Sequence, residues 1–176
     1  TSEDYFYQET EVWKHPLLSN FVPPSVLQPR SVRRPMAPES DYKDDDSAAS
    51  AKVLMEADVL VSTGGHGQRE GLSTHWEMWS FVRGGMSPMQ ALSAATINPA
   101  TYIGMNQDLG SLEVGKLADM VILDGDPLAD IRHTDKISKV MLNGRVFAAS
   151  TLQEVVTGDQ KLKPFWWQNR AQDQIR

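Results

Sequence analysis

The chain has 176 residues, with 23 acidic and 17 basic side chains, a formal net charge of −6 and no cysteine. This length allows one ordinary globular domain, whereas a complete (β/α)8 barrel typically needs about 250 residues. The negative charge gives no global reason to bind nucleic acid or an anionic membrane surface. The lack of cysteine excludes disulfides, thiolate nucleophiles and cysteine-ligated metal centres.

We expect neither a membrane-spanning run in this chain nor an export signal at its start. No run reaches the roughly 18 apolar residues that a membrane-spanning helix needs, and no basic and apolar leader opens the sequence. Because the first residue is Thr1, we expect a processed chain or one that starts partway through a longer sequence.

Residues 1–46 are rich in proline and in large apolar side chains. Proline recurs too often for a helix or a central strand, so we expect irregular, extended chain. The many aromatic and aliphatic groups argue against a free linker. We expect this segment to pack on another surface, which can belong to this chain or lie outside it. The acidic run Asp44, Asp45 and Asp46 at its end is interpreted as a solvated turn.

Residues 47–105 combine helical and strand patterns in the order of a β/α unit. Ser47 can cap a helix that continues through residue 57. A β-branched run at 58–63 then predicts a short buried strand, and the glycines that follow it predict a loop at its carboxyl end.

Three helices are predicted beyond this loop. The first covers 74–82 and is stopped by two glycines, and the second starts at its N-cap Ser87 and reaches residue 95. An Asn-Pro pair interrupts this second helix, and a short helix through Tyr102 follows.

Residues 106–150 change to a period of two, which predicts strands. We expect one strand over 118–123 and two more at 139–142 and 145–148. An Asn-Gly pair joins the last two, and both of its residues tolerate the positive φ angles of a type I′ hairpin turn.

The last segment, residues 151–176, is polar except for three adjacent rings. We expect Phe165, Trp166 and Trp167 to dock on a neighbouring surface as a C-terminal clamp.

The residues with the most chemical potential lie in the glycine-rich loop. His66 is flanked by glycines at the carboxyl end of the predicted strand, where backbone can approach a ligand closely. An imidazole there can ligate a metal or carry a proton, or it can hydrogen-bond the backbone of its own loop. Gln68 and Arg69 are candidates for substrate contact, with a solvated loop as the alternative.

His75 and Glu77 follow the loop, on the helix predicted at 74–82. Two residues apart, they do not share a helix face. We therefore do not expect the two side chains to bind one ion together.

Residues 109–124 (LGSLEVGKLADMVILD) strongly resemble the C-terminal signature of the amidohydrolase superfamily. Residues 86–100 (MSPMQALSAATINPA) look like the region of the last barrel helix in that family, and 140–146 (VMLNGRV) match its closing hairpin. The resemblance covers about residues 59–147 in the right order. It implies an α/β fold with the C-terminal β/α units of a metal-dependent hydrolase (β/α)8 barrel, incomplete in this chain, plus strands of a small β-sandwich.

A second set of motifs resembles one subgroup, the large amidohydrolase-related proteins in which a β-propeller precedes the barrel. These motifs are GHGQREGL at 65–72, HWE at 75–77, PFWW at 164–167 and the opening YFYQETEVW at 5–13. The resemblance implies a bacterial protein that is periplasmic or secreted.

The loop departs from the family pattern at one position. In typical members the last barrel strand ends in Gly-Thr-Asp, whose Asp binds metal and takes the proton from the attacking water. The corresponding stretch here is Gly64-Gly65-His66, so the resemblance makes His66 a metal ligand or the general base. A neutral imidazole brings no negative charge, which puts the usual mechanism in question.

The resemblance implies a C-terminal fragment of a metal-dependent hydrolase that cleaves C–N bonds in small molecules: non-peptide amides, cyclic amides or dipeptide-like compounds. The complete protein would use a divalent ion, which we expect to be zinc. Because the family's other metal ligands have no counterpart here, the site would need the remainder of the barrel or a partner chain. Two alternatives stay open, a non-catalytic accessory or binding domain with an amidohydrolase-like shell and a purely structural segment of a propeller-containing assembly.

Overall fold

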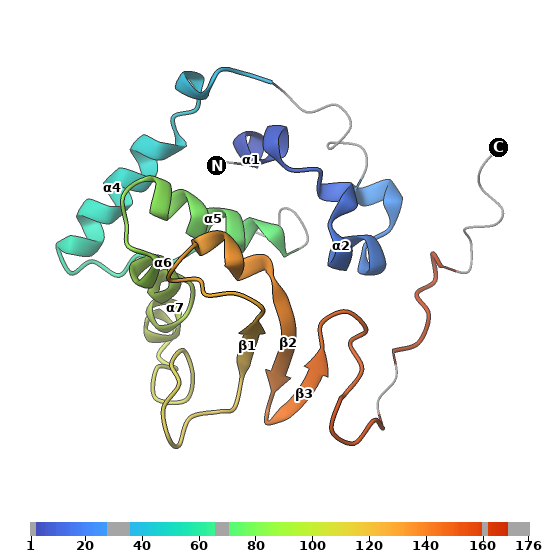
Figure 1. Ribbon diagram of the computed structural model, residues 1–176. Helices are drawn as coiled ribbons and strands as arrows, with labels where there is room; N and C mark the ends of the chain where they lie inside the picture. The colour runs from blue at the N-terminus through green and yellow to red at the C-terminus, as the bar shows by residue number, and fades with distance from the viewer. Residues whose placement is uncertain (1–2, 28–35, 66–70, 160–161, 169–176) are drawn as a thin grey trace.

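The computed structural model describes residues 3–27, 36–65, 71–159 and 162–168. Its elements, with η for a 3-10 helix, are α1 (Glu3–Glu9), η1 (Val12–Lys14), α2 (Pro16–Phe21), η2 (Glu39–Asp41), α4 (Asp44–Glu56), α5 (Leu72–Arg83), α6 (Pro88–Ala95), α7 (Ile97–Tyr102), β1 (Met120–Leu123), η3 (Ile131–Asp135), β2 (Ile137–Leu142) and β3 (Arg145–Ala148). Helix α5 lies at the centre, in contact with α1, α4, α6 and η3, and the sheet lies below the helices in Figure 1.

The N-terminal segment contains short helices, so the prediction of irregular, extended chain is wrong there. Helix α1 contains no proline, and α2 begins with Pro16 in its first turn. A proline at that position costs little because its missing N–H has no partner within the helix. The surface on which we expected this segment to pack is found within the same chain, on α5.

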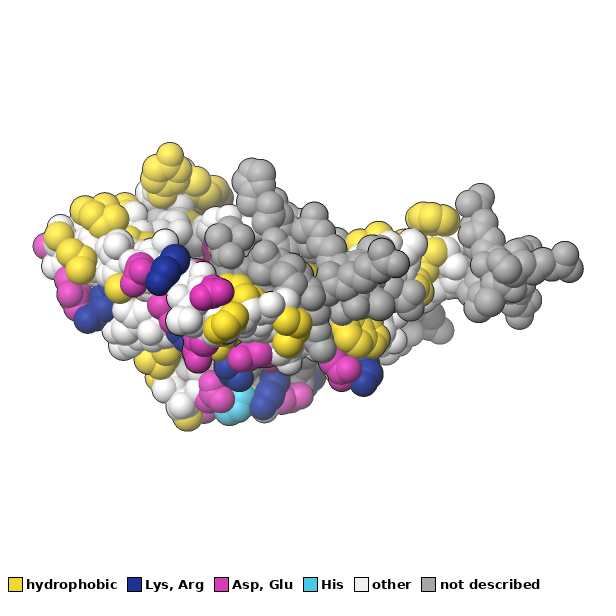
Figure 2. Space-filling model, turned by 90° about the horizontal axis from the view of Figure 1, so that it is seen from above, with side chains coloured by type: hydrophobic (Ala, Val, Ile, Leu, Met, Phe, Trp, Pro, Cys, Tyr) yellow, Lys and Arg dark blue, Asp and Glu magenta, His cyan; other side chains and the backbone are white. Residues whose placement is uncertain are grey.

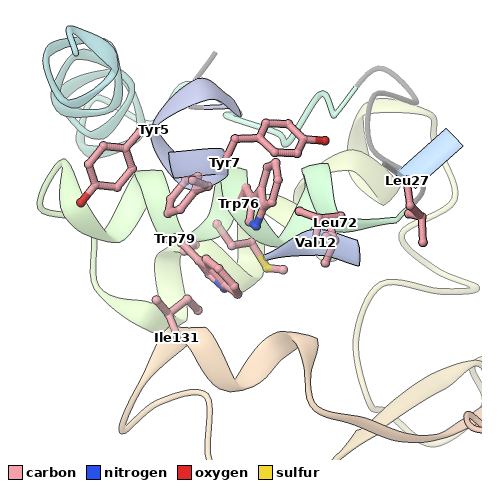
Figure 3. Close-up of a cluster of buried hydrophobic side chains, with 11 residues drawn as sticks. Tyr5, Tyr7, Val12, Leu27, Leu72, Trp76, Trp79 and Ile131 are labelled. Atoms are coloured by element: carbon pink, nitrogen blue, oxygen red, sulfur yellow. The ribbon is translucent and has the colours of Figure 1, made fainter. Parts of the chain in front are cut away.

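A cluster of aromatic rings forms the core between α1 and α5 (Figure 3). Phe6 and Trp76 are both 2% exposed, and their rings stack with centroids 5.6 Å apart. Tyr7 meets Trp76 edge-on at 5.0 Å. The indole N–H of Trp79 donates to the hydroxyl of Thr134 at 2.9 Å, which joins α5 to η3. Burial of such rings is a large favourable contribution to folding, so α5 is the element around which the described chain packs.

The acidic residues that we interpreted as a solvated turn form the first turn of α4. The helix therefore begins before Ser47, its predicted N-cap. Negative charge is favourable at a helix N-terminus, and the guanidinium of Arg83 lies 3.7 Å from Asp44 and 2.9 Å from Asp45. It also lies over the ring of Tyr5, 3.5 Å from its centroid. Arg83 thus joins α5 to both α1 and α4.

The segment at 58–63 is not part of a sheet in the described chain, and the prediction of a buried strand is wrong there. Val59 and Leu60 are 48% and 51% exposed. The side chain of Asn98, in α7, donates a hydrogen bond to the backbone of this segment at 2.8 Å. A β-branched run favours extended backbone, but a strand also needs a neighbour to pair with. The barrel units implied by the resemblance are not seen among the described residues.

Helices α5 and α6 confirm two of the sequence predictions. Helix α5 ends at Gly84, and α6 begins at the predicted N-cap Ser87. The Ser87 hydroxyl accepts the N–H of Gln90 at 3.2 Å, and the Gln90 side chain accepts the N–H of Ser87 at 2.8 Å. This reciprocal capping box satisfies two backbone donors that the helix leaves free. The next helix, α7, begins at Ile97 and includes the proline that we expected to precede it.

The three strands form an antiparallel sheet in the order β1-β2-β3. Val121 lies opposite Val140, which in turn lies opposite Phe147. Asn143 and Gly144 have φ angles of 49° and 76°, as a type I′ turn requires. The predicted strands and hairpin are thus confirmed, while a second sheet that would complete a β-sandwich is not seen in the part of the chain that is described.

One aromatic residue of the tail, Phe165, contacts the N-terminal segment, whereas Trp166 is 65% exposed. The rings of Phe165 and Trp167 stack at 4.4 Å, and Phe165 meets Phe21 of α2 edge-on at 6.1 Å. The surface on which Phe165 docks therefore belongs to the same chain. Within the described ranges no helix is long and apolar enough to cross a bilayer. Figure 2 shows acidic and basic side chains mixed along one face of the molecule.

Candidate functional site

The three residues predicted to carry function, His66, Gln68 and Arg69, lie outside the described residues. Their roles therefore stay predictions. What the structure does describe is the chain on both sides of them, up to Gly65 and from Gly71 onwards.

The chain that leads to His66 rests on two helices. The N–H of Thr63 donates to a carbonyl at the end of α6 at 2.9 Å. One residue later, the N–H of Gly64 donates to Oε2 of Glu77, in α5, at 2.5 Å. A Cβ on Gly65 would lie only 2.6 Å from the hydroxyl oxygen of Ser73, also in α5. The backbone at 64–65 is therefore held directly against the first turns of α5.

The chain rejoins the described structure at the N-terminus of the same helix. Gly71 is the N-cap of α5 and has a φ of 89°, a left-handed conformation that glycine adopts without strain. Helix α5 thus positions both flanks of the candidate loop, and its own position is fixed by the aromatic core.

Glu77 is a residue that the sequence reasoning did not assign to the site. We considered it only as a metal ligand beside His75, and its spacing argued against that. The two residues do engage different partners, because Glu77 accepts a hydrogen bond from Gly64 whereas His75 lies near His15. A side chain that accepts a bond from backbone 13 residues away leaves no pattern in the sequence.

A second group of titratable residues joins the N-terminal segment to the rest of the molecule. His15 caps α2 by accepting the N–H of Leu18 at 3.4 Å, and its Nε2 lies 4.0 Å from Oδ2 of Asp135. Burial, followed by the neighbouring charge of His15, lowers the pKa of His75 to about 4. Burial also lowers the pKa of His15 and raises that of Asp135. Both histidines are therefore neutral near pH 7.

A divalent ion would need several ligands of the right kind. Among the residues that the structure describes, no group of three or more His, Asp or Glu side chains could hold a metal ion. Nδ1 of His75 is buried without a hydrogen-bond partner, but it is a single donor atom. These residues do not fit a metal site by themselves, and we derive no catalytic step through one.

Comparison with protein families gives a clear match. The family model described as "Amidohydrolase family" matches residues 17–147, which is most of the chain. The chain belongs to the amidohydrolase family. The resemblance drawn from the motif at 109–124 is thereby confirmed.

Curated relatives match over limited stretches of their own length. An imidazolonepropionase from Shouchella clausii is 29% identical over 136 residues, which cover 67% of this chain and 30% of the relative. An imidazolonepropionase from Symbiobacterium thermophilum is 67% identical over 39 residues, or 22% of this chain and 9% of the relative. Adenine deaminase 1 from Carboxydothermus hydrogenoformans is 35% identical over 74 residues, which cover 42% of this chain and 11% of the relative. The chain thus spans less than a third of these relatives.

Two solved structures are similar in sequence and fold. Phenylurea hydrolase B is 31% identical, with a TM-score of 0.51; the match covers 65% of this chain and 29% of the hydrolase chain. A Xaa-Pro dipeptidase with bound methionine in its active site is 25% identical, with a TM-score of 0.56; the match covers 84% of this chain and 33% of the dipeptidase chain. The described helices and sheet therefore resemble part of each of these proteins.

Proposed function

We propose that these residues are the C-terminal part of an amidohydrolase that hydrolyses C–N bonds in small molecules. The family match over residues 17–147 carries this proposal. The names of similar proteins narrow the chemistry to a cyclic amide, an aminopurine, a urea or an Xaa-Pro dipeptide. Because those proteins are at least three times as long as the matched part, the rest of the active site comes from outside this chain, as the remainder of a barrel or a partner chain.

The candidate loop supplies the residues that we propose for the reaction. His66 acts as a metal ligand or as the general base, and Gln68 and Arg69 contact the substrate. The family pattern supports the role of His66, which stands where typical members have Asp. The described flanks of the loop, Gly64 and Gly71, both lie at α5: Gly64 donates a hydrogen bond to Glu77, and Gly71 is the N-cap of the helix. The cofactor that we propose for the complete protein is a divalent ion, zinc.

The subgroup motifs carry two further parts of the proposal. The resemblance of residues 65–72 and 164–167 to propeller-containing amidohydrolases supports a bacterial origin and a periplasmic or secreted location. It also supports a β-propeller in the complete protein.

Hydrolysis by the native, full-length protein tests the proposed function. Ammonia or amine release would be measured with adenine, a phenylurea and an Xaa-Pro dipeptide as substrates, and ring opening would be measured with an imidazolone. We expect turnover of at least one of them, reduced about 100-fold or more by His66→Ala, since a positioned acid–base group contributes that much. His133→Gln serves as control, because His133 is a half-buried histidine of η3 whose Nδ1 lies 2.9 Å from the carbonyl oxygen of Asp126. Equal turnover by His66→Ala and wild type would remove His66 from the mechanism.

A second candidate function is a non-catalytic accessory or binding domain. One observation favours it, namely that the described residues contain no cluster able to hold a metal ion. This candidate predicts a folded native protein that binds one of the four compounds and hydrolyses none of them. The same assay, run beside a binding measurement such as calorimetry, separates the two.

A further inference from the structure

We propose that His15 and His75 form an acid-sensitive latch on the segment 12–21, which contains η1 and α2. Near pH 7 the latch holds this segment on α5 and η3, and it releases the segment when both imidazoles take up protons. His15 is the N-cap of α2, His75 lies in α5, and Asp135 of η3 faces His15. The inference does not depend on the proposed hydrolysis.

The first observation is that the start of α2 uses the neutral form of His15. Nδ1 of His15 accepts the N–H of Leu18 at 3.4 Å. A ring nitrogen that accepts a hydrogen bond carries no proton, so the proton of the neutral ring is on Nε2. Protonation converts Nδ1 into a donor, which cannot cap a helix N-terminus because the free groups there are N–H donors. Uptake of one proton therefore removes the cap of α2 and places a positive charge at the positive end of the helix dipole.

The second observation is that His75 offers no partner for an added proton. Nδ1 of His75 is buried and has no hydrogen-bond partner among the described residues. A protonated ring carries a hydrogen on both nitrogens, so this atom would become a buried donor without an acceptor. Burial, followed by the charge of His15, lowers the pKa of His75 to about 4. Protonation of both rings thus brings like charges together where the N-terminal segment meets α5.

The third observation is that Asp135 offsets these charges incompletely. Its Oδ2 lies 4.0 Å from Nε2 of His15, which is too long for a hydrogen bond, and the side chains of His15 and Asp135 are only 16% and 24% exposed. Burial lowers the pKa of His15, and the attraction of Asp135 opposes this only in part. Burial also raises the pKa of Asp135, so that acid weakens the ion pair that would hold a protonated His15.

The other charged and titratable groups around the latch have partners of their own or act on Asp135. They are the pairs Lys14–Glu11 at 2.7 Å and Arg132–Glu9 at 4.0 Å, Glu77 with its bond from Gly64, and Lys136 and His133 beside Asp135. His133 is thus a further imidazole of this junction, and the experiment has to separate it from the latch.

The segment that the latch holds depends on its docking. Helix α2 has six residues, which is too short for a helix that is stable by itself. Val12 of η1 is 2% exposed and belongs to the same core cluster as Leu72 of α5 (Figure 3), and Leu18 packs against this cluster. Loss of the cap and repulsion at the junction therefore act on the same short segment. Helix α1 is held separately, by the ring of Phe6 on Trp76.

Amide hydrogen exchange on the native, full-length protein at pH 7 and pH 5 tests the latch. Protection factors are compared, because they remove the pH dependence of exchange in an unstructured chain. The N–H of Ser19 reports on α2, since it donates to the carbonyl of His15 at 2.9 Å. The N–H of Ala91 is the matched reference, since it donates at 3.1 Å to the carbonyl of Ser87, an N-cap whose hydroxyl does not titrate in this range. Each bond opens the ladder of its helix, where exchange proceeds through local opening.

Between pH 7 and pH 5 we expect the protection factor of Ser19 to fall about tenfold or more, while that of Ala91 changes by less than about twofold. The size follows from His75, whose pKa rises from about 4 to about 6.5 when the segment leaves. His15→Asn keeps a capping oxygen that takes no proton, and His75→Gln removes the second charge, so each should reduce the fall. The double variant should hold the change within about twofold, and His133→Gln should retain the fall.

Several results would overturn the proposal. A constant protection factor at Ser19 would show that the imidazoles do not hold the segment, and a rise would show that the ion pair of His15 with Asp135 closes it more firmly in acid. Equal falls at Ser19 and Ala91 would show a general effect of acid on helices. An undiminished fall in the double variant, or its loss in His133→Gln, would assign the response to other groups.

A measurement on the wild type keeps the test open if the variants do not fold. The nitrogen-15 chemical shifts of the His15 ring at pH 7 distinguish its two neutral tautomers. The latch requires the proton on Nε2, because Nδ1 accepts the N–H of Leu18. A proton on Nδ1 would exclude the cap and overturn the proposal.

Discussion

The carboxylate of Asp119 accepts a hydrogen bond at 2.6 Å from the backbone N–H of Asn143, the first residue of the turn between β2 and β3. The carbonyl of the preceding residue, Ala118, accepts the N–H of Gly144 at 3.1 Å. Residues 118 and 119 thus hold the hairpin turn against the start of β1. Since both belong to the motif at 109–124, the most recognisable stretch of the sequence serves the fold.

Loss of the Asp119 carboxylate should destabilise the hairpin. In Asp119→Ala we expect the free energy of unfolding to fall by about 1–2 kcal/mol, because a backbone donor loses a charged acceptor. Asp119→Asn, which keeps an oxygen, should lose less. Urea denaturation measures the change, with Asp159→Ala in the exposed tail as control. Equal midpoints for Asp119→Ala and the control would contradict this role.

Gly84 is the point of closest approach between α4 and α5. A Cβ at this position would lie 2.4 Å from the Cβ of Ala48 and 2.7 Å from the backbone nitrogen of Ala49. Because backbone atoms cannot rotate away, we expect Gly84→Ala to lower the free energy of unfolding by about 2 kcal/mol or more. Gly64→Ala is the control for stability, since a Cβ there meets nothing within 4 Å. A loss no greater than that of the control would show that the helices separate easily.

The buried histidines predict loss of stability in mild acid. The folded pKa of His75 is about 4 and that of His15 is also lowered, whereas both titrate near 6.5 in the unfolded chain. Below pH 6.5 the unfolded chain therefore binds more protons, and the free energy of unfolding falls until His75 also protonates in the fold near pH 4. Asp135 acts in the opposite sense, because its raised pKa favours the protonated carboxyl of the folded state and offsets part of the loss.

The size of this effect can be measured by chemical denaturation between pH 7 and pH 4.5. We expect a loss on the order of 2–3 kcal/mol, of which His75→Gln should remove the larger share. Val114→Ser, which replaces a fully exposed side chain that does not titrate, should leave the pH dependence unchanged. An identical pH dependence in His75→Gln and wild type would contradict the burial of His75.

Elements encoded by neighbouring residues could be predicted from the sequence. The Asn143-Gly144 turn needs only two residues that tolerate positive φ, and the capping box of α6 needs only Ser87 and Gln90, three residues apart. The N-terminal helices were missed because we weighed how many prolines occur rather than where they fall, and Pro16 falls in a first turn. Position, not number, decides what a proline does to a helix.

Contacts between distant residues could not be predicted in the same way. The segment at 58–63 has the composition of a strand, but pairing depends on a neighbour that the sequence pattern does not reveal. Arg83 meets Asp44 and Asp45 across about 40 residues of sequence, so the acidic run looked like a solvated turn. In the candidate site, the glycines pointed to the loop, whereas the hydrogen bond of Glu77 to Gly64 became visible only in the structure.

The intact mass of the native protein that carries the C-terminal Phe165-Trp166-Trp167 motif, purified from its source, tests the central claim most directly. The sequence given accounts for 19.6 kDa. If these residues are the C-terminal part of an amidohydrolase, the mass will lie far above that value, as it does for relatives of which the chain spans less than a third. A native protein of 19.6 kDa that purifies without a partner chain would contradict the account.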